Sequence, residues 1–469
     1  MTLTGVRPAP ASPAGKPPRP GARRAHPFRG ELLRGTAPWA GAAVLLTVSV
    51  TMAEKSAGWQ GGWGETQALL RTVSVLLAAP IAGAAGCWQG GREWRRRTEE
   101  LGATSSRGPL ARFLAAALPT ALWSALACLI AHAAALLACL PYASAGRPSV
   151  TAPLSDAVFV MAVTLIGHVA GGVIRWRLAA PFFGGGVYLG SAVVSSLGSG
   201  YRFLSPVAVS DSGMAHSLYV WWEPLVTAGW FGGLAVAAVL AVAAARRWTA
   251  LPALLIAAVC GVTLVKSGDR MWRPDPLPAR QVCDTSVRPV ICVSQRHPAV
   301  LPQVTRALSR LTTRLEGVGH LPERFVDLPG RRGPNDVQLP MLTPLGQSLT
   351  RGELTDPERY RWEAAQMLVH RDACDVRDPD RAEQRVQLVD RTVVAWLAPH
   401  PSAGFHETAL GWAEKRGDTA EAAGIRAEMR SFDRALGRLG AMDPEERRQW
   451  LSRYFETARS CDPGKVPAL

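Results

Sequence analysis

Residues 91–101, with the sequence GREWRRRTEEL, separate two long apolar runs, TQALLRTVSVLLAAPIAGAAGCW (66–88) and LARFLAAALPTALWSALACLIAHAAALLACL (110–140). A helix that crosses the hydrocarbon core of a bilayer needs roughly 20 apolar residues, and both runs are long enough. The charged stretch between them fits three descriptions: a surface helix, a nucleic-acid-binding patch or a loop between two membrane spans. The rest of the chain decides among them.

The composition divides the chain of 469 residues into three parts. Residues 1–36 are rich in Pro, Arg, Ala and Gly, which predicts a disordered basic arm. Residues 37–265 are dominated by Ala, Leu, Val and Gly and are expected to form a transmembrane domain. Residues 266–469 have the composition of a charged globular domain, and a segment of about 200 residues is long enough to bury a core.

Seven apolar runs predict a membrane all-α fold with about seven transmembrane helices: residues 37–52, 66–88, 110–140, 157–174, 182–197, 224–244 and 249–265. Cytoplasmic loops carry an excess of Lys and Arg, so the basic clusters fix the orientation. With a cytoplasmic N-terminus, the clusters at 92–97, 175–177 and 246–247 all fall on the cytoplasmic side. Seven crossings then place residues 266–469 outside the cytoplasm. A signal peptide over the first run is the alternative to a span there.

The distribution of arginines also excludes a nucleic-acid interface. The formal net charge of +15 is by itself compatible with nucleic acid as a partner. The basic residues, however, lie in short segments between apolar runs and not on one face of the soluble domain. The partner that this pattern predicts is the lipid bilayer of the cell membrane.

The eight cysteines fall into two groups of four. Four lie in or beside apolar runs, where a thiol packs as a small hydrophobic group: Cys87, Cys128, Cys139 and Cys260. The other four lie in the C-terminal domain, and an even number in an oxidising compartment suggests two disulfides. We favour the pairs Cys283–Cys292 and Cys374–Cys461 among the three possible connectivities, and four free thiols are the alternative.

The C-terminal domain is expected to be mostly helical, with a little strand. Residues 290–293 predict a strand and residues 301–315 an amphipathic helix, and three Asp-Pro pairs mark helix starts: 356–357, 378–379 and 443–444. The pair His406-Glu407 lacks the second histidine of a zinc-protease motif, and no G-x-S-x-G, C-x-x-C or P-loop pattern is present. The sequence therefore predicts no enzyme, no cofactor and no metal site.

Two features of the apolar domain are candidates for function. His132 and His168 fall inside predicted spans, where polar groups are costly and can mark a transport pathway. A histidine satisfied by a neighbouring helix is the alternative. Gly186 and Gly190 have G-x-x-x-G spacing, which permits close helix packing within the chain or in a homodimer.

The charged stretch itself has helical spacing, with Trp94, Thr98 and Leu101 on one face. Such a helix can lie on the anionic inner leaflet, or it can bind a partner protein. The residues that we expect to make these contacts are Glu93, Trp94, Arg95, Arg96, Arg97, Glu99, Glu100 and Leu101.

The segment TEELGATSSRGPLAR (98–112), which follows the second span, resembles the cytosolic connection of ABC-2-type exporter permeases. The cytosolic N-terminus and the six-span layout over residues 30–245 are also similar to that family. The resemblance implies that residues 90–109 couple a separate ATPase subunit to the spans. This sequence departs from the family by a seventh span and by the C-terminal domain. The stretch RPVICVSQRHPAVLPQV (288–304) is similar to domains appended to actinobacterial membrane proteins of this permease-like type.

The sequence therefore supports two functions. The first is the permease subunit of an ABC-2-type exporter that works with a separate ATPase. The alternative is a membrane-anchored sensor or scaffold, in which the spans only anchor an extracytoplasmic domain that binds a ligand.

Overall fold

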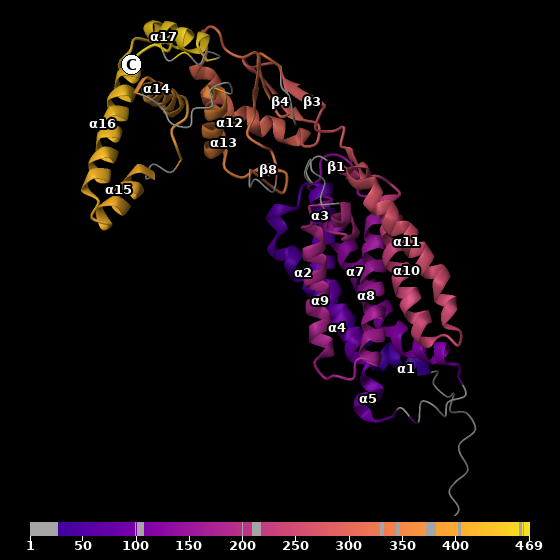
Figure 1. Cartoon of the computed structure of the whole chain (residues 1–469). Coiled ribbons are helices and arrows are strands. Elements are labelled where there is room, and N and C mark those ends of the chain that lie inside the picture. The colour runs from indigo at the N-terminus through magenta and orange to yellow at the C-terminus, as the bar shows by residue number, and fades with distance from the viewer. Residues whose placement is uncertain are drawn as a thin grey trace, which may run out of the picture.

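The computed structural model describes residues 27–98, 100, 107–198, 200–208, 217–328, 333–343, 348–371, 381–401, 405–458, 462 and 464–469. Figure 1 shows an elongated helical bundle and a second domain at one end of it. The bundle helices are α1 (Pro27–Arg34), α2 (Ala37–Glu54), α3 (Trp63–Val73), α4 (Ala79–Gly90), α5 (Arg92–Arg96), α7 (Pro109–Cys139), α8 (Thr151–Val173), α9 (Ala179–Ser195), α10 (Glu223–Ala243) and α11 (Ala250–Ser267).

All seven apolar runs are helical, and six of the helices are long and apolar enough to cross a membrane. The exception is the fifth run, because α9 has 17 residues and a helix of that length spans only about 26 Å at 1.5 Å per residue. The first and last runs are longer than the sequence indicates, since helical structure extends over Phe28–Glu54 and Arg247–Met271. Residues 27–34, which we assigned to the disordered arm, form α1.

Helices α4 and α8 are in backbone contact through glycines. A Cβ atom built on Gly86 would lie 2.1 Å from the carbonyl oxygen of Thr164, and one on Gly171 would lie 1.9 Å from that of Cys87. Gly90 and Gly167 make equally close approaches, 2.0 Å from the His168 oxygen and 2.3 Å from the Gly83 oxygen. The close approach of α4 and α8 is therefore made by these two G-x-x-x-G pairs.

Gly186 and Gly190 on α9 do not take part in this packing. A Cβ atom at either position would meet no atom within 4 Å in the described part of the chain. The expectation that they pack against another helix of the same chain is wrong, because this face of α9 points away from the bundle. Their role in a homodimer stays a prediction.

The second domain combines a four-stranded sheet with helices. The sheet order is β3 (Gln281–Asp284), β4 (Val290–Ser294), β5 (Arg324–Val326) and β6 (Asp336–Gln338), with β3 and β4 antiparallel and the other pairs parallel. The helices are α12 (Leu301–Arg314), α13 (Pro357–Val369), α14 (Arg381–Leu397), α15 (Phe405–Lys415), α16 (Thr419–Ala441) and α17 (Pro444–Glu456). Their apolar faces share one core that includes Val304, Leu308, Phe325, Tyr360, Val393 and Tyr454.

Several predictions for this domain are confirmed. Residues 290–293 lie in β4 and residues 301–314 form α12. The side chain of Asp356 accepts hydrogen bonds from the backbone N–H groups of Glu358 and Arg359, and Asp443 caps α17 through Glu445 N–H. The third Asp-Pro start, at 378–379, lies outside the described residues.

Two small sheets complete the fold. Strand β1 (Ser217–Tyr219), which precedes α10, pairs antiparallel with β2 (Trp272–Pro274), which follows α11. Hairpin β7–β8 (Leu349–Thr350 and Glu353–Leu354) precedes α13. The remaining short helical turns are η1 (Ser56–Gly58), η2 (Ser74–Ala78), η3 (Gly200–Leu204), η4 (Arg247–Thr249), η5 (Gly268–Met271) and η6 (Pro298–Val300).

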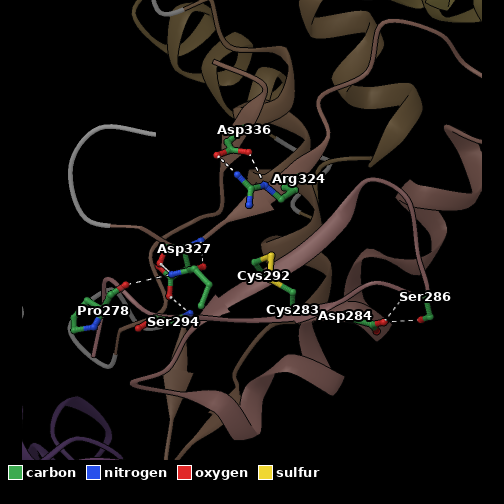
Figure 2. Close-up of a disulfide and its surroundings, with 10 residues drawn as sticks. Pro278, Cys283, Asp284, Ser286, Cys292, Ser294, Arg324, Asp327 and Asp336 are labelled. Atoms are coloured by element: carbon green, nitrogen blue, oxygen red, sulfur yellow. Dashed lines mark hydrogen bonds and ion pairs between the residues drawn. A yellow bond between two sulfur atoms is a disulfide. The ribbon is translucent and has the colours of Figure 1, made fainter. Parts of the chain in front are cut away.

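The disulfide Cys283–Cys292 is present, as predicted. The two cysteines are register partners on the antiparallel strands β3 and β4, so their side chains meet directly across the ladder. Figure 2 shows this bond between the two strands, with the Arg324–Asp336 ion pair of β5 and β6 nearby. Cys374 and Cys461 lie outside the described residues, and their pairing stays a prediction.

The α4–α8 contact predicts different effects for two glycine substitutions. In Gly86→Ala the added methyl group meets the backbone of Thr164, so the two helices must move apart. We expect a loss of about 1–3 kcal/mol in stability, measured as a lower melting temperature in detergent. Gly186→Ala is the control, because its methyl group meets nothing within 4 Å. Equal melting temperatures for the two variants would contradict the close contact.

Candidate functional site: a buried ion-pair network

The bundle contains a network of charged side chains close to the end that carries the C-terminal domain. Arg71 of α3 lies between two carboxylates: its Nε is 3.1 Å from Asp156 Oδ1 of α8, and its terminal NH1 nitrogen is 3.2 Å from Glu223 Oε1 of α10. The three side chains are at most 6% exposed. One guanidinium group therefore joins three helices in the apolar interior.

His132 of α7 adds a fourth helix to the network. Its Nε2 lies 3.3 Å from Asp156 Oδ2, and its Nδ1 lies 2.8 Å from the carbonyl oxygen of Cys128. Both ring nitrogens face acceptors, so an imidazolium that donates two hydrogen bonds satisfies them both. With His132 in that form, the network holds two positive and two negative charges.

Further contacts hold Arg71 and Glu223 in place. The Thr227 hydroxyl donates to Glu223 Oε1 at 2.9 Å, and the Arg71 guanidinium lies over the Tyr219 ring, 4.4 Å from its centroid. Tyr219 belongs to β1, so the network reaches the small sheet above the bundle. Arg71 also lies three residues before a π-helical turn, Ser74–Ala78, which joins α3 to α4. Such turns frequently occur at functional sites.

The two histidines predicted to mark a pathway do not come together. His168 lies 12 residues after Asp156 on α8, about 18 Å along the helix axis. Its ring packs edge-on against Phe113 at 4.9 Å between centroids, and it is 7% exposed. The structure thus places His132 in the network and His168 near the other end of α8. The Nδ1 of His168 has no hydrogen-bond partner in the described part of the chain.

Most of the network was not predicted from the sequence. Arg71 is the one charged residue within the apolar run 66–88, and Asp156 and Glu223 directly precede the runs that begin at 157 and 224. Charged side chains at membrane depth are candidates for function. That rule singles out Arg71, but no sequence spacing indicates which acidic residues face it.

The charged segment after α4 lies at the opposite end of the bundle (Figure 1). Helix α5 is only five residues long, because Arg97 has a left-handed backbone with φ of 54° and ends it. The expectation that Thr98 continues the helical face of Trp94 is therefore wrong, because Thr98 lies beyond the helix. Glu99 and Leu101 are outside the described residues.

Contacts with α1 and α4 hold α5 in place. Arg92 NH1 lies 2.8 Å from Glu31 Oε1 of α1, and the Arg95 guanidinium packs over the Trp88 ring at 4.0 Å. Trp94 is half-buried. Four charged side chains of this segment are exposed: Glu93, Arg96, Arg97 and Glu100. These exposed groups remain available to a partner protein or to lipid headgroups.

The C-terminal domain contacts the bundle at the first turn of α3. Arg296 NH2 lies 3.5 Å from Glu65 Oε1, and Glu65 is almost completely buried. Arg351 Nε donates to Gln60 Oε1 at 2.7 Å, just before α3 begins. Since Glu65 and Arg71 are on the same helix, α3 links the domain junction directly to the buried network.

No family model, no curated protein and no solved structure matches this chain. The resemblance to ABC-2-type permeases therefore rests on the segment 98–112 and on the layout of the spans.

The network predicts a large effect of removing its one arginine. Arg71→Met leaves Asp156 and Glu223 buried without their main counter-charge, and breaking a buried pair in this way costs about 3–5 kcal/mol. We expect a much lower melting temperature in detergent. Arg246→Met removes an exposed arginine and is the control. If both variants melt like the wild type, the ion pairs do not stabilise the bundle.

Proposed function

We propose that this chain is the membrane-spanning subunit of an ABC-2-type exporter and that a separate ATPase subunit acts on α5 from the cytosol. The observation that carries the proposal is the position of α5. It follows α4 after a single residue, it is held to α1 by Arg92–Glu31, and it presents exposed charges of both signs. A partner that binds this short helix is therefore in direct mechanical contact with the spans.

The helix contacts supply a route from α5 to the buried network. A displacement of α5 moves α4, and the glycine contacts leave no space for α4 to move without α8. Helix α8 carries Asp156, while α3, which is continuous with α4 through the π-helical turn, carries Arg71. Motion received at α5 thus moves Arg71 and Asp156 together, so their contacts with Glu223 of α10 and His132 of α7 change at the other end, where helix separation opens a path.

The path of the chain supports seven crossings in this proposal. Asp156 near the start of α8 and Glu223 at the start of α10 both contact Arg71, so these two helices begin at the same end of the bundle. Helix α8 ends at Val173, and α9 lies between it and α10 in the chain. The chain therefore returns through α9, a short span that requires some local thinning of the bilayer.

This orientation places α5 in the cytosol and the C-terminal domain outside. The disulfide Cys283–Cys292 supports the second assignment, because disulfides persist in oxidising compartments. The basic clusters at 92–97, 175–177 and 246–247 then share the cytoplasmic side.

The domain junction favours a second candidate function, a membrane-anchored sensor or scaffold. Arg296–Glu65 and Arg351–Gln60 fasten the C-terminal domain to the start of α3. In this alternative, ligand binding outside shifts α3 and, through Arg71, the packing of the bundle. No ATPase takes part, so binding of such a subunit distinguishes the two functions.

The exporter proposal predicts that exposed charges on α5 hold an ATPase subunit. In Arg96→Glu/Arg97→Glu we expect an ATPase that co-purifies with the wild-type protein from native membranes to be lost, because the sign of the contact surface is reversed. Arg246→Glu/Arg247→Glu changes another exposed pair by the same charge and should retain it. Retention by both inserted variants, or no ATPase with the wild type, would favour the sensor.

The orientation makes a separate prediction for single cysteine variants. Ser309 on α12 and Glu93 on α5 are both exposed. In intact cells, a membrane-impermeant maleimide should label Ser309→Cys, whereas Glu93→Cys should react only after lysis. Labelling in the opposite order would place the C-terminal domain in the cytosol and would contradict seven crossings.

A further inference from the structure

The C-terminal domain has an arginine-lined groove between α12 and α13. The groove has a volume of about 760 Å³, and its wall includes Arg306 and Arg310 of α12 and Arg361 of α13. Arg306 and Arg310 are one helical turn apart, so their side chains project from the same face. Two carboxylates, Glu353 and Glu358, also line it.

The arginines of this groove are poorly neutralised. Within the described part of the chain, Arg306 and Arg310 have no carboxylate within 4.0 Å, and Arg361 has only Glu358 at 4.0 Å. The Arg361 side chain is 11% exposed, whereas that of Glu358 is 69% exposed. A largely buried guanidinium is normally matched by a close counter-charge.

Arg314, one turn further along α12 than Arg310, also lies among positive charges. Burial, followed by the charges of Arg361, Arg310 and Arg447, lowers the pKa of Arg314. Arg314 itself donates to the carbonyl oxygen of Leu397, and among the described residues it reaches no carboxylate. The positive charges of α12 and α13 therefore repel one another, and an anion placed between them relieves that repulsion.

We propose that this groove binds a phosphate ester whose alcohol part carries hydroxyl groups. Guanidinium groups bind phosphate oxygens with two parallel hydrogen bonds, and two arginines one turn apart can hold a single phosphate. Glu353 and Glu358 at the same groove are acceptors for hydroxyl groups of the ester. Three arginines and two glutamates leave the groove with an excess of positive charge. This excess suits a ligand that has one anionic group attached to an uncharged polar part.

The position of the groove allows two sources for such a ligand. Glu353 and Leu354 belong to β8, and its hairpin partner β7 packs against η1 at the end of the bundle (Figure 1). The groove thus lies close to the lipid headgroups in the orientation proposed above. A soluble polyol phosphate and the headgroup of a glycerol phospholipid present the same chemistry.

The test uses the full-length protein in a neutral detergent and two probes. Glycerol 1-phosphate is titrated calorimetrically, and short-chain phosphatidylglycerol is compared with phosphatidylcholine by native mass spectrometry. We expect the wild type to bind at least one of the two anionic probes. Binding of the first alone identifies a soluble ester as the source, and binding of the second alone identifies a lipid headgroup.

Arg306→Gln/Arg310→Gln should weaken this binding tenfold or more. Arg430→Gln/Arg434→Gln is the matched control, because these two exposed arginines are also one turn apart, on α16, and line no part of this groove. We expect its affinity to stay within twofold of the wild type. If the first variant melts early, Arg310→Gln alone replaces it. The proposal is overturned if the wild type binds neither probe, or if both double variants bind as well as the wild type or lose affinity equally.

Discussion

The buried charge of Arg71 is the constraint on which the arrangement of the bundle depends. A guanidinium in an apolar interior is tolerated only with its counter-charges close by. Those counter-charges come from two other helices, since Asp156 lies on α8 and Glu223 on α10. The three helices are thereby fixed in register near one end, and His132 fixes α7 to the same group. None of these helices can slide along its axis without exposing a charge to apolar surroundings.

The glycine contacts between α4 and α8 provide the complementary constraint further along the bundle. Because the two backbones touch at Gly86 and Gly171, the helices move together or separate completely. Electrostatic contacts at one end and steric contacts towards the other make α3, α4 and α8 behave as one rigid body. The partner proposed at α5 and the ligand proposed for the C-terminal domain would both act on this body, from opposite ends, through Arg92–Glu31 and Arg296–Glu65. Both proposed functions therefore depend on the ion-pair network, because it holds together the helices that would move.

Apolar runs and Asp-Pro pairs predicted the bundle helices and two helix starts of the C-terminal domain, but no prediction covered α16, and contacts between distant residues were out of reach. The apolar runs located every long helix of the bundle, and Asp356 and Asp443 marked helix starts. G-x-x-x-G spacing occurs in four helices of the bundle, and sequence offers no way to tell the closely packed pairs from Gly186 and Gly190. The end of α5 depends on the positive φ of Arg97, a conformation that is uncommon for arginine and that helical spacing does not reveal. The partners of Arg71 depend on how α8 and α10 pack, which is a tertiary property.

A double-mutant cycle between Arg71 and Asp156 measures whether these two side chains form a stabilising ion pair inside the bundle. The unfolding free energy is measured in detergent for the wild type, Arg71→Met, Asp156→Asn and the double variant. If the two side chains form a buried ion pair, the double variant is much less destabilised than the sum of the single variants, with a coupling energy of about 2 kcal/mol or more. A coupling energy below about 0.5 kcal/mol is what independent sites give, and it would contradict the account.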